Sequence, residues 1–342
     1  MQSFDGASNQ KYNNIAIVGA RQEPDGADVR QVDVLRELQP LVAENLNRHL
    51  AIPDVAAGWK PHDYIPYDEG RNFAALGGED WQVGQSRLSP GVRTALILNL
   101  LTEDNLPAYH RTIMNAFGKE GAWPAWANRW TAEEGRHSIV LRDYLVVTRG
   151  VDPDKLEELR LAHMSNGYEH ETADTPLKVL AYVSFQEMAT RISHRNTGTA
   201  SGDPILDRLL GRVAKDENLH MIFYRNLVAG AFDIAPDDTM EAVADQVVNF
   251  QMPGHGVPDF QRQAAAIARE GIYNIPLHLG KVLEPVIKAW NVRERSDLSP
   301  RGEEAREKLL TFLGELSVEA DKFIASQERL KARRIARGIA DA

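Results

Sequence analysis

The strongest constraint on this 342-residue chain is a short pattern, Glu-x-x-His, which occurs at Glu134–His137 and again at Glu217–His220. Residues three apart on a helix lie on one face, about one turn from each other. A carboxylate and an imidazole placed in this way can hold one metal ion together. One copy of so short a pattern is weak evidence, because many proteins contain one by chance. Two copies indicate a metal site only if further ligands stand at matching positions.

Two further carboxylates do stand at matching positions. Glu103 precedes Glu134 by 31 residues, Glu187 precedes Glu217 by 30, and the two halves are offset by 83 or 84 residues. Each interval fits an antiparallel helix pair, and four-helix di-metal sites take one Glu from each of two helices and Glu-x-x-His from the other two. The alternative is a set of solvated acids on outer helix faces, which the apolar neighbouring residues disfavour. The predicted ligands are Glu103, Glu134, His137, Glu187, Glu217 and His220.

The rest of the sequence also has the periodicity of helices. Ser89-Pro90, Thr175-Pro176 and Asp203-Pro204 are typical helix starts. Pro107 should kink its helix, and Gly198 and Gly202 should end theirs. The ligand helices are predicted at about 89–117, 124–149, 176–196 and 204–230, with further helices at 236–250, 258–270, 278–290 and from Ser299 onward. Because alternating strand patterns are scarce, we predict an all-α fold: a mobile tail over 1–28 and one ferritin-like domain, a four-helix bundle extended by extra helices, over 29–342.

Composition excludes several functions. The formal charge is −10, which argues against nucleic acid as the main partner. The chain has no cysteine, so disulfides, Fe–S clusters and thiol chemistry are excluded, and any metal must bind to His, Asp or Glu. No apolar run approaches the roughly 20 residues that a membrane span requires, and residues 1–28 lack the apolar core of a secretory signal. We therefore expect a cytoplasmic protein.

Several residues near the ligands are candidates for supporting roles. Glu133 and Asp216 each precede a ligand Glu, and each could accept a hydrogen bond from a metal-bound imidazole across the site. His110 and His194 follow Glu103 and Glu187 by seven residues, about 10.5 Å along a helix, which is too far to share one metal. We interpret these two as structural or supporting residues. The other histidines show no ligand spacing: His49, His62, His163, His170, His255 and His278.

Four motifs, read in order, resemble a known family. They are Thr102-Glu-Asp-Asn-Leu-Pro107, Trp130-Thr-Ala-Glu-Glu-Gly-Arg-His137, Ser184-Phe-Gln-Glu-Met-Ala-Thr190 with Ile192-Ser-His194, and Asp216-Glu-Asn-Leu-His220. Together they resemble the soluble acyl-ACP desaturases, which include plant stearoyl-ACP desaturase. The actinobacterial members look more similar still, through stretches such as Trp59-Lys-Pro-His-Asp-Tyr-Ile-Pro66. The resemblance runs from about residue 30 to 330.

The resemblance implies a ferritin-like bundle, a homodimer and a di-iron centre with the same six ligands, in which Mn is a possible substitute. It implies an active-site threonine at Thr190 and an electron-entry path through Trp59, Asp216 and His137. Two departures stand out: the plant motif has basic residues where this chain has Asn218 and Leu219, and Gly135 replaces the usual Asn.

The implied activity is O2-dependent desaturation of a saturated fatty acyl chain carried on acyl carrier protein, with electrons from a ferredoxin-type donor. Alternatives are a di-iron hydroxylase or N-oxygenase, a metal-storage or ferroxidase bundle, and a non-catalytic homologue that binds metal or acyl carrier. Acyl carrier proteins are acidic, so docking requires a basic patch. The candidate docking residues are Arg191, Arg195, Arg208, Arg212 and Lys215.

Overall fold

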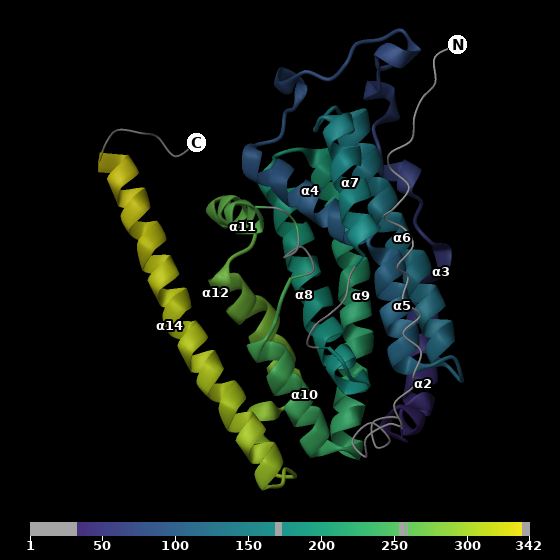
Figure 1. Ribbon diagram of the computed structural model, residues 1–342, viewed down its shortest axis with the longest axis vertical. Coiled ribbons are helices and arrows are strands. Elements are labelled where there is room, and N and C mark those ends of the chain that lie inside the picture. The colour runs from purple at the N-terminus through teal and green to yellow at the C-terminus, as the bar shows by residue number, and fades with distance from the viewer. Residues whose placement is uncertain (1–32, 168–172, 253–256, 258, 337–342) are drawn as a thin grey trace, which may run out of the picture.

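The computed structural model describes residues 33–167, 173–252, 257 and 259–336 (Figure 1). Within these ranges the regular structure is helical and contains no strand, so the prediction of an all-α fold is confirmed. The tail predicted over residues 1–28 lies outside the described residues. Across the same ranges, no helix has the length and apolar character to cross a membrane.

Four helices form the bundle that carries the predicted ligands: α4 (Pro90–Asp104), α6 (Trp123–Val147), α8 (Pro176–Ser201) and α9 (Pro204–Ile234). α8 packs along α9, and α4 and α6 close the bundle by packing against each other and against α8 and α9 respectively. Proline occupies the first turn of all four helices, where its missing N–H costs nothing. The Asp203 carboxylate caps α9 by accepting from the N–H groups of Ile205 and Leu206.

Two predicted helix boundaries differ from the structure. The helix predicted over 89–117 is two helices, because α4 ends at Asp104 and α5 (Leu106–Phe117) starts with Pro107 in its first turn. Gly198 does not end α8, which continues to Ser201 before Gly202. A Cβ atom at Gly198 would lie 3.1 Å from Asp207 Cα, so this glycine allows α8 and α9 to approach closely rather than breaking the helix.

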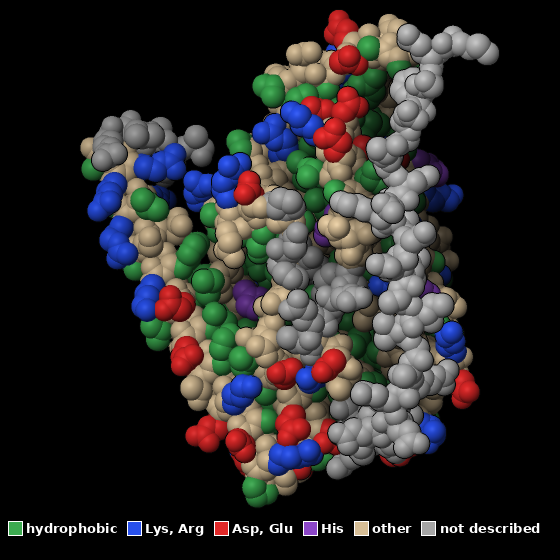
Figure 2. Space-filling model, viewed as in Figure 1, with side chains coloured by type: hydrophobic (Ala, Val, Ile, Leu, Met, Phe, Trp, Pro, Cys, Tyr) green, Lys and Arg blue, Asp and Glu red, His purple; other side chains and the backbone are tan. Residues whose placement is uncertain are grey.

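The remaining helices surround the bundle. α2 (Gln39–Leu50), α3 (Pro53–Ala57) and α7 (Pro153–Asn166) belong to the first half of the chain. In the second half, α10 (Pro236–Val248), α11 (Phe260–Arg269), α12 (Ile275–Leu277), a π-helical turn (His278–Leu283) and α13 (Glu284–Ala289) precede α14 (Pro300–Ala336). α14 packs on α10 and α12, and its C-terminal half leans away from the body (Figure 1). Basic side chains gather at that end in the space-filling view (Figure 2).

Apolar side chains fill the bundle on both sides of the polar residues that it encloses. The larger cluster includes Trp126, whose ring stacks on Phe223 with centroids 3.4 Å apart, and the smaller one includes Leu96, Leu141 and Leu210. Burying such side chains stabilises the fold by about 1.5–3 kcal/mol each. The predicted ligands therefore lie in a dry interior, where a carboxylate requires a partner.

Candidate metal centre

The structure brings all six predicted ligand side chains together inside the bundle. They form two groups that could each hold a metal ion, and the candidate ligand atoms of each group lie within 4.8 Å of one another. None of the six residues is more than 7% exposed. Glu134 and Glu217 belong to both groups, so their carboxylates can bridge two ions. The first group is completed by Glu103 and His137, and the second by Glu187 and His220.

Several atoms of this cluster have no hydrogen-bond partner among the residues that the structure describes. They are Glu134 Oε1, Glu187 Oε2, Glu217 Oε1 and His220 Nδ1, all fully buried. Buried polar atoms are almost always paired, so four such atoms in one place call for an explanation. His220 Nδ1 lies 2.6 Å from Glu134 Oε1, within hydrogen-bonding distance, yet the two atoms do not form a hydrogen bond. Lone pairs that converge in this way fit a divalent cation, and the two-His, four-carboxylate donor set suits iron or manganese.

The outer nitrogen of each imidazole contacts an acid from the opposite helix. His137 Nε2 lies 3.4 Å from Asp216 Oδ2, and His220 Nε2 lies 2.9 Å from Glu133 Oε2. This is the crossed arrangement that the sequence analysis expects. An Nε2–H that donates to a carboxylate leaves the Nδ1 lone pair directed at the cluster, which is the tautomer that a metal ligand needs.

Crowding perturbs the carboxyl groups in opposite directions. Burial raises the pKa of Glu187 well above its usual range, and the neighbouring Glu134 raises it further. Burial and then Glu217 raise the pKa of Glu134. Burial alone would also raise the pKa of Glu103, but contacts with His137 and His194 outweigh it and lower that pKa to about 2. A divalent cation would favour the ionised form of all four carboxylates.

On one side of the cluster a hydrogen-bonded relay leads to the surface. The Trp59 indole N–H donates to Asp216 Oδ2 at 2.6 Å, and the same oxygen contacts His137. The Trp59 ring is nearly parallel to the His137 ring, with centroids 6.4 Å apart. The guanidinium groups of Arg136 and Arg212 lie over the indole, 4.9 and 5.9 Å from its centroid. These contacts link the three residues that the family resemblance assigns to electron entry.

Trp59 also lies in an open surface groove. The five predicted docking residues all line this groove, which α3, α8 and α9 form together with the turn at residues 61–64. Arg195 is paired with Asp207 at 2.6 Å, and Arg212 with Asp216. Arg208 lies over the Tyr64 ring, and Lys215 is exposed. The full basic set is Arg191, Arg195, Arg208, Arg212 and Lys215.

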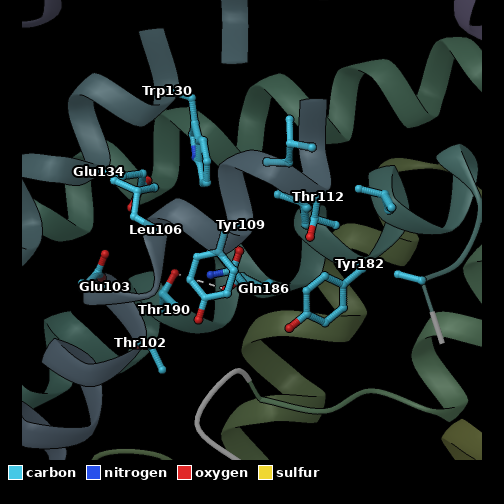
Figure 3. A pocket seen from close by; sticks show the side chains of 14 residues that line it. Thr102, Glu103, Leu106, Tyr109, Thr112, Trp130, Glu134, Tyr182, Gln186 and Thr190 are labelled. Carbon is cyan, nitrogen blue, oxygen red and sulfur yellow. Dashed lines mark hydrogen bonds between the residues drawn. The ribbon is translucent and has the colours of Figure 1, made fainter. Parts of the chain in front are cut away.

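A mostly apolar pocket borders the cluster on another side (Figure 3). Among the described residues, it shares no lining residue with the groove. It follows α5 and α8 from Glu103 and Thr190 toward Thr112 and Tyr182. The Thr190 hydroxyl donates to Glu217 Oε2 at 2.9 Å, at the boundary between pocket and cluster. The lining residues are Thr102, Glu103, Leu106, Tyr109, Thr112, Ile113, Trp130, Glu134, Ala173, Val179, Tyr182, Val183, Gln186 and Thr190.

Comparison with known proteins identifies the family. A sequence model described as fatty acid desaturase matches residues 30–337. The chain belongs to the fatty acid desaturase family. It is 47% identical over 310 residues to the Mycobacterium tuberculosis protein named "Putative acyl-[acyl-carrier-protein] desaturase DesA1", covering 89% of this chain and 91% of the relative. It is 30% identical over 302 residues to stearoyl-[acyl-carrier-protein] 9-desaturase 1 of Arabidopsis thaliana, covering 82% of this chain and 74% of the relative.

A solved structure in this family supports the predicted architecture. The X-ray structure of DesA2 from Mycobacterium tuberculosis H37Rv matches with a TM-score of 0.65 at 32% identity, covering 80% of this chain and 99% of that chain. The prediction of a ferritin-like helical fold is confirmed by this match.

The contacts of this desaturase include supporting residues beyond those predicted. Trp130 Nε1 donates to Glu187 Oε1 at 2.9 Å, although the sequence analysis assigned Trp130 no role. His194 Nε2 lies 3.1 Å from Glu103 Oε1, which agrees with a supporting residue. His110 instead contacts the Thr131 hydroxyl at 2.7 Å, and within the described part of the chain it does not contact a predicted ligand.

Arg129 and His49 are further residues that the sequence analysis did not select. Arg129 Nε donates to Glu133 Oε1 at 2.5 Å, and His49 Nε2 lies 3.0 Å from Glu133 Oε2. The sequence does contain a pattern that could have identified Arg129. An arginine stands four residues before Glu133 and another four residues before Asp216, at Arg129 and Arg212. No sequence spacing connects His49 to the site, since it comes from α2, outside the bundle.

Proposed function

We propose that this protein is an O2-dependent desaturase that introduces a double bond into a saturated fatty acyl chain carried on acyl carrier protein. The relatives named for this substrate support it. The single observation that carries the proposal is the adjacency of a six-residue metal cluster and an apolar pocket, with Thr190 between them. A pocket of this kind can hold an alkyl chain beside an oxidising centre.

In this proposal each group of residues has a defined task. Glu103, Glu134, His137, Glu187, Glu217 and His220 would hold two iron ions, with manganese as the possible substitute. Bound iron would supply the redox chemistry by which O2 takes two hydrogens from adjacent carbons, together with two electrons from the donor and two protons, and is released as two water molecules. Asp216 and Glu133 hold the two imidazoles in the required tautomer. The apolar lining excludes water and determines which carbons lie next to the cluster, and the Thr190 hydroxyl supplies a donor at that boundary.

The basic groove fits an acidic electron-donor protein better than it fits the acyl carrier for which its residues were predicted. Its wall contains Trp59, the outer end of the relay to His137, and it shares no lining residue with the acyl pocket. A donor docked there would reach the cluster through Trp59 and Asp216. Basic side chains steer an acidic partner, and a ferredoxin-type protein has the required chemistry.

The decisive experiment is a reconstituted assay. The iron-loaded protein is incubated with O2, a reduced ferredoxin and saturated acyl chains of graded length on acyl carrier protein, and the products are analysed by mass spectrometry. We expect loss of two hydrogens from one preferred chain length. Recovery of only hydroxylated product would instead support a hydroxylase, and assembly into a large cage with iron uptake would support a storage protein.

The groove can be tested in the same assay. Replacing Arg208 and Lys215 by Glu should raise the KM for reduced ferredoxin at least tenfold and leave the KM for acyl carrier substrate unchanged. Arg329→Glu on the exposed end of α14 is the matched control for charge reversal. A rise in the KM for the acyl carrier substrate alone would instead support the first prediction, that these residues bind acyl carrier protein. We also propose a cytoplasmic homodimer, to be checked by cell fractionation and light scattering.

A further inference from the structure

The surroundings of the two imidazoles show a near-repeat. Beside His137 stands Asp216, with Arg212 four residues before it, and beside His220 stands Glu133, with Arg129 four residues before it. In both cases the arginine and the acid lie on one helix and the imidazole on another. The two arrangements therefore match in ligand, acid and arginine.

The two arrangements differ in the next side chain that contacts the acid. Asp216 accepts from the indole of Trp59, which lies in the groove, whereas Glu133 contacts the imidazole of His49, which is 5% exposed. His49 comes from α2 and stands edge-on to the Trp126 ring, with centroids 5.3 Å apart. The side chain that supports the second imidazole is thus supplied by a helix outside the bundle.

His49 Nε2 reaches both oxygens of Glu133, at 3.2 Å from Oε1 and 3.0 Å from Oε2. The other N–H groups on this carboxylate come from His220 and Arg129, and the Arg129 side chain is 32% exposed. Burial alone would raise the pKa of Glu133, but the contacts with His220 and His49 outweigh it and lower that pKa strongly. His49 and His220 are the fully buried donors, so they share the task of fixing the plane of the carboxylate.

We propose that His49 is a positioning residue for the metal ligand His220. Through Glu133 it holds the His220 ring in the tautomer and orientation that directs Nδ1 at the cluster. The effect should be confined to the metal position that contains Glu187 and His220, since His137 has its own support from Asp216 and Trp59. This inference rests on the proposed metal centre. Loss of an acid that contacts a metal-bound imidazole typically costs 10–100-fold in metal affinity, and because His49 acts one contact further out, its loss should cost less, about three- to tenfold.

Two polar substitutions of similar size separate positioning from packing. The amide nitrogen of Gln reaches about as far as imidazole Nε2, whereas that of Asn is shorter, so His49→Gln should keep the contact with Glu133 and His49→Asn should lose it. Anaerobic titration with Co2+ follows affinity by calorimetry and ligand geometry by visible absorption. For His49→Asn we expect one equivalent bound with wild-type affinity and the other weakened about three- to tenfold with an altered spectrum. His49→Gln should restore both.

The control is His278→Asn, which removes a histidine of the π-helical turn whose contacts are with Tyr273 and Phe250 rather than with the cluster. It should change the melting temperature of the metal-free protein and leave both Co2+ affinities intact. The inference is overturned if His49→Asn binds two equivalents as the wild type does, or if both equivalents weaken equally. A wild-type protein that binds no Co2+ would overturn the proposed metal centre itself, and with it this inference.

Discussion

Replacing Glu217 by Gln should remove both metal positions, whereas replacing Glu103 by Gln should remove one. The reason is geometric: Glu217 belongs to both groups of ligand atoms, and Glu103 belongs to one. Gln keeps the shape of the side chain and removes its charge, so the packing of the bundle is preserved. Glu134→Gln and Glu187→Gln form a second pair of the same kind, one shared and one not.

The size of the effect follows from linkage. A metal ion at about 100 times its Kd stabilises the folded protein by about 2.7 kcal/mol. An unfolding entropy of about 2.1 cal/mol/K per residue amounts to about 0.7 kcal/mol/K for a chain of this length, so each ion should raise the melting temperature by about 4 °C. The wild type should therefore gain about 8 °C on loading, Glu103→Gln about half of that, and Glu217→Gln almost nothing.

Two measurements check this result. Elemental analysis of the loaded proteins gives the number of ions per chain, and thermal melts with and without chelator give the stabilisation. The metal-free Glu134→Gln protein should melt no lower than the metal-free wild type, because burial and the neighbouring Glu217 raise the pKa of Glu134, so the ionised carboxylate is disfavoured there. Equal metal content in the Glu103 and Glu217 variants would refute the assignment of Glu217 as a shared ligand.

Three further predictions concern single side chains. Trp59→Phe removes the N–H that donates to Asp216 at 2.6 Å, so stopped-flow reduction of the loaded protein by ferredoxin should slow while metal content stays unchanged. Thr190→Val removes the hydroxyl bonded to Glu217, and we expect less product per O2 consumed, measured with an oxygen electrode and mass spectrometry. Burial lowers the pKa of His278 from 6.5 to about 4, so the folded state binds its proton less readily than the unfolded state. Folding stability should be full above pH 6.5 and fall by about 1 kcal/mol by pH 5.5, and in denaturant melts His278→Asn should remove this loss.

The sequence predicted the helices well where local chemistry decides their ends. Pro90, Pro176 and Pro204 lie in first turns, as expected. The prediction was wrong at Gly198, because the requirement there is tertiary: α9 approaches α8 too closely for a Cβ atom, and no local pattern reports that approach.

The candidate site shows the same difference between residues that local spacing predicts and residues that only tertiary contacts bring in. The six proposed ligands could be selected from spacing alone. Residues three apart lie on one face of a helix, and the Glu and Glu-x-x-His pattern occurs twice in the chain at nearly equal intervals. His49 could not be found in this way, because it joins the site from α2 through contacts with Glu133, 84 positions away in the sequence. The five basic residues line one groove together with Trp59, which their positions in the sequence did not show, and their docking role stays a prediction.

The position of Trp59 has a consequence for the proposed transfer of electrons to the metal centre. Its indole is partly exposed in the groove, so in the free protein the outer end of the relay is in contact with water. A protein that occupies the groove covers this end and replaces mobile solvent by fixed side chains, which lowers the cost of rearranging the surroundings when charge moves. In the proposed electron path, a donor protein bound in the groove would therefore shield the indole from water, and we expect a small reductant in solution, which cannot cover the indole, to be the poorer donor.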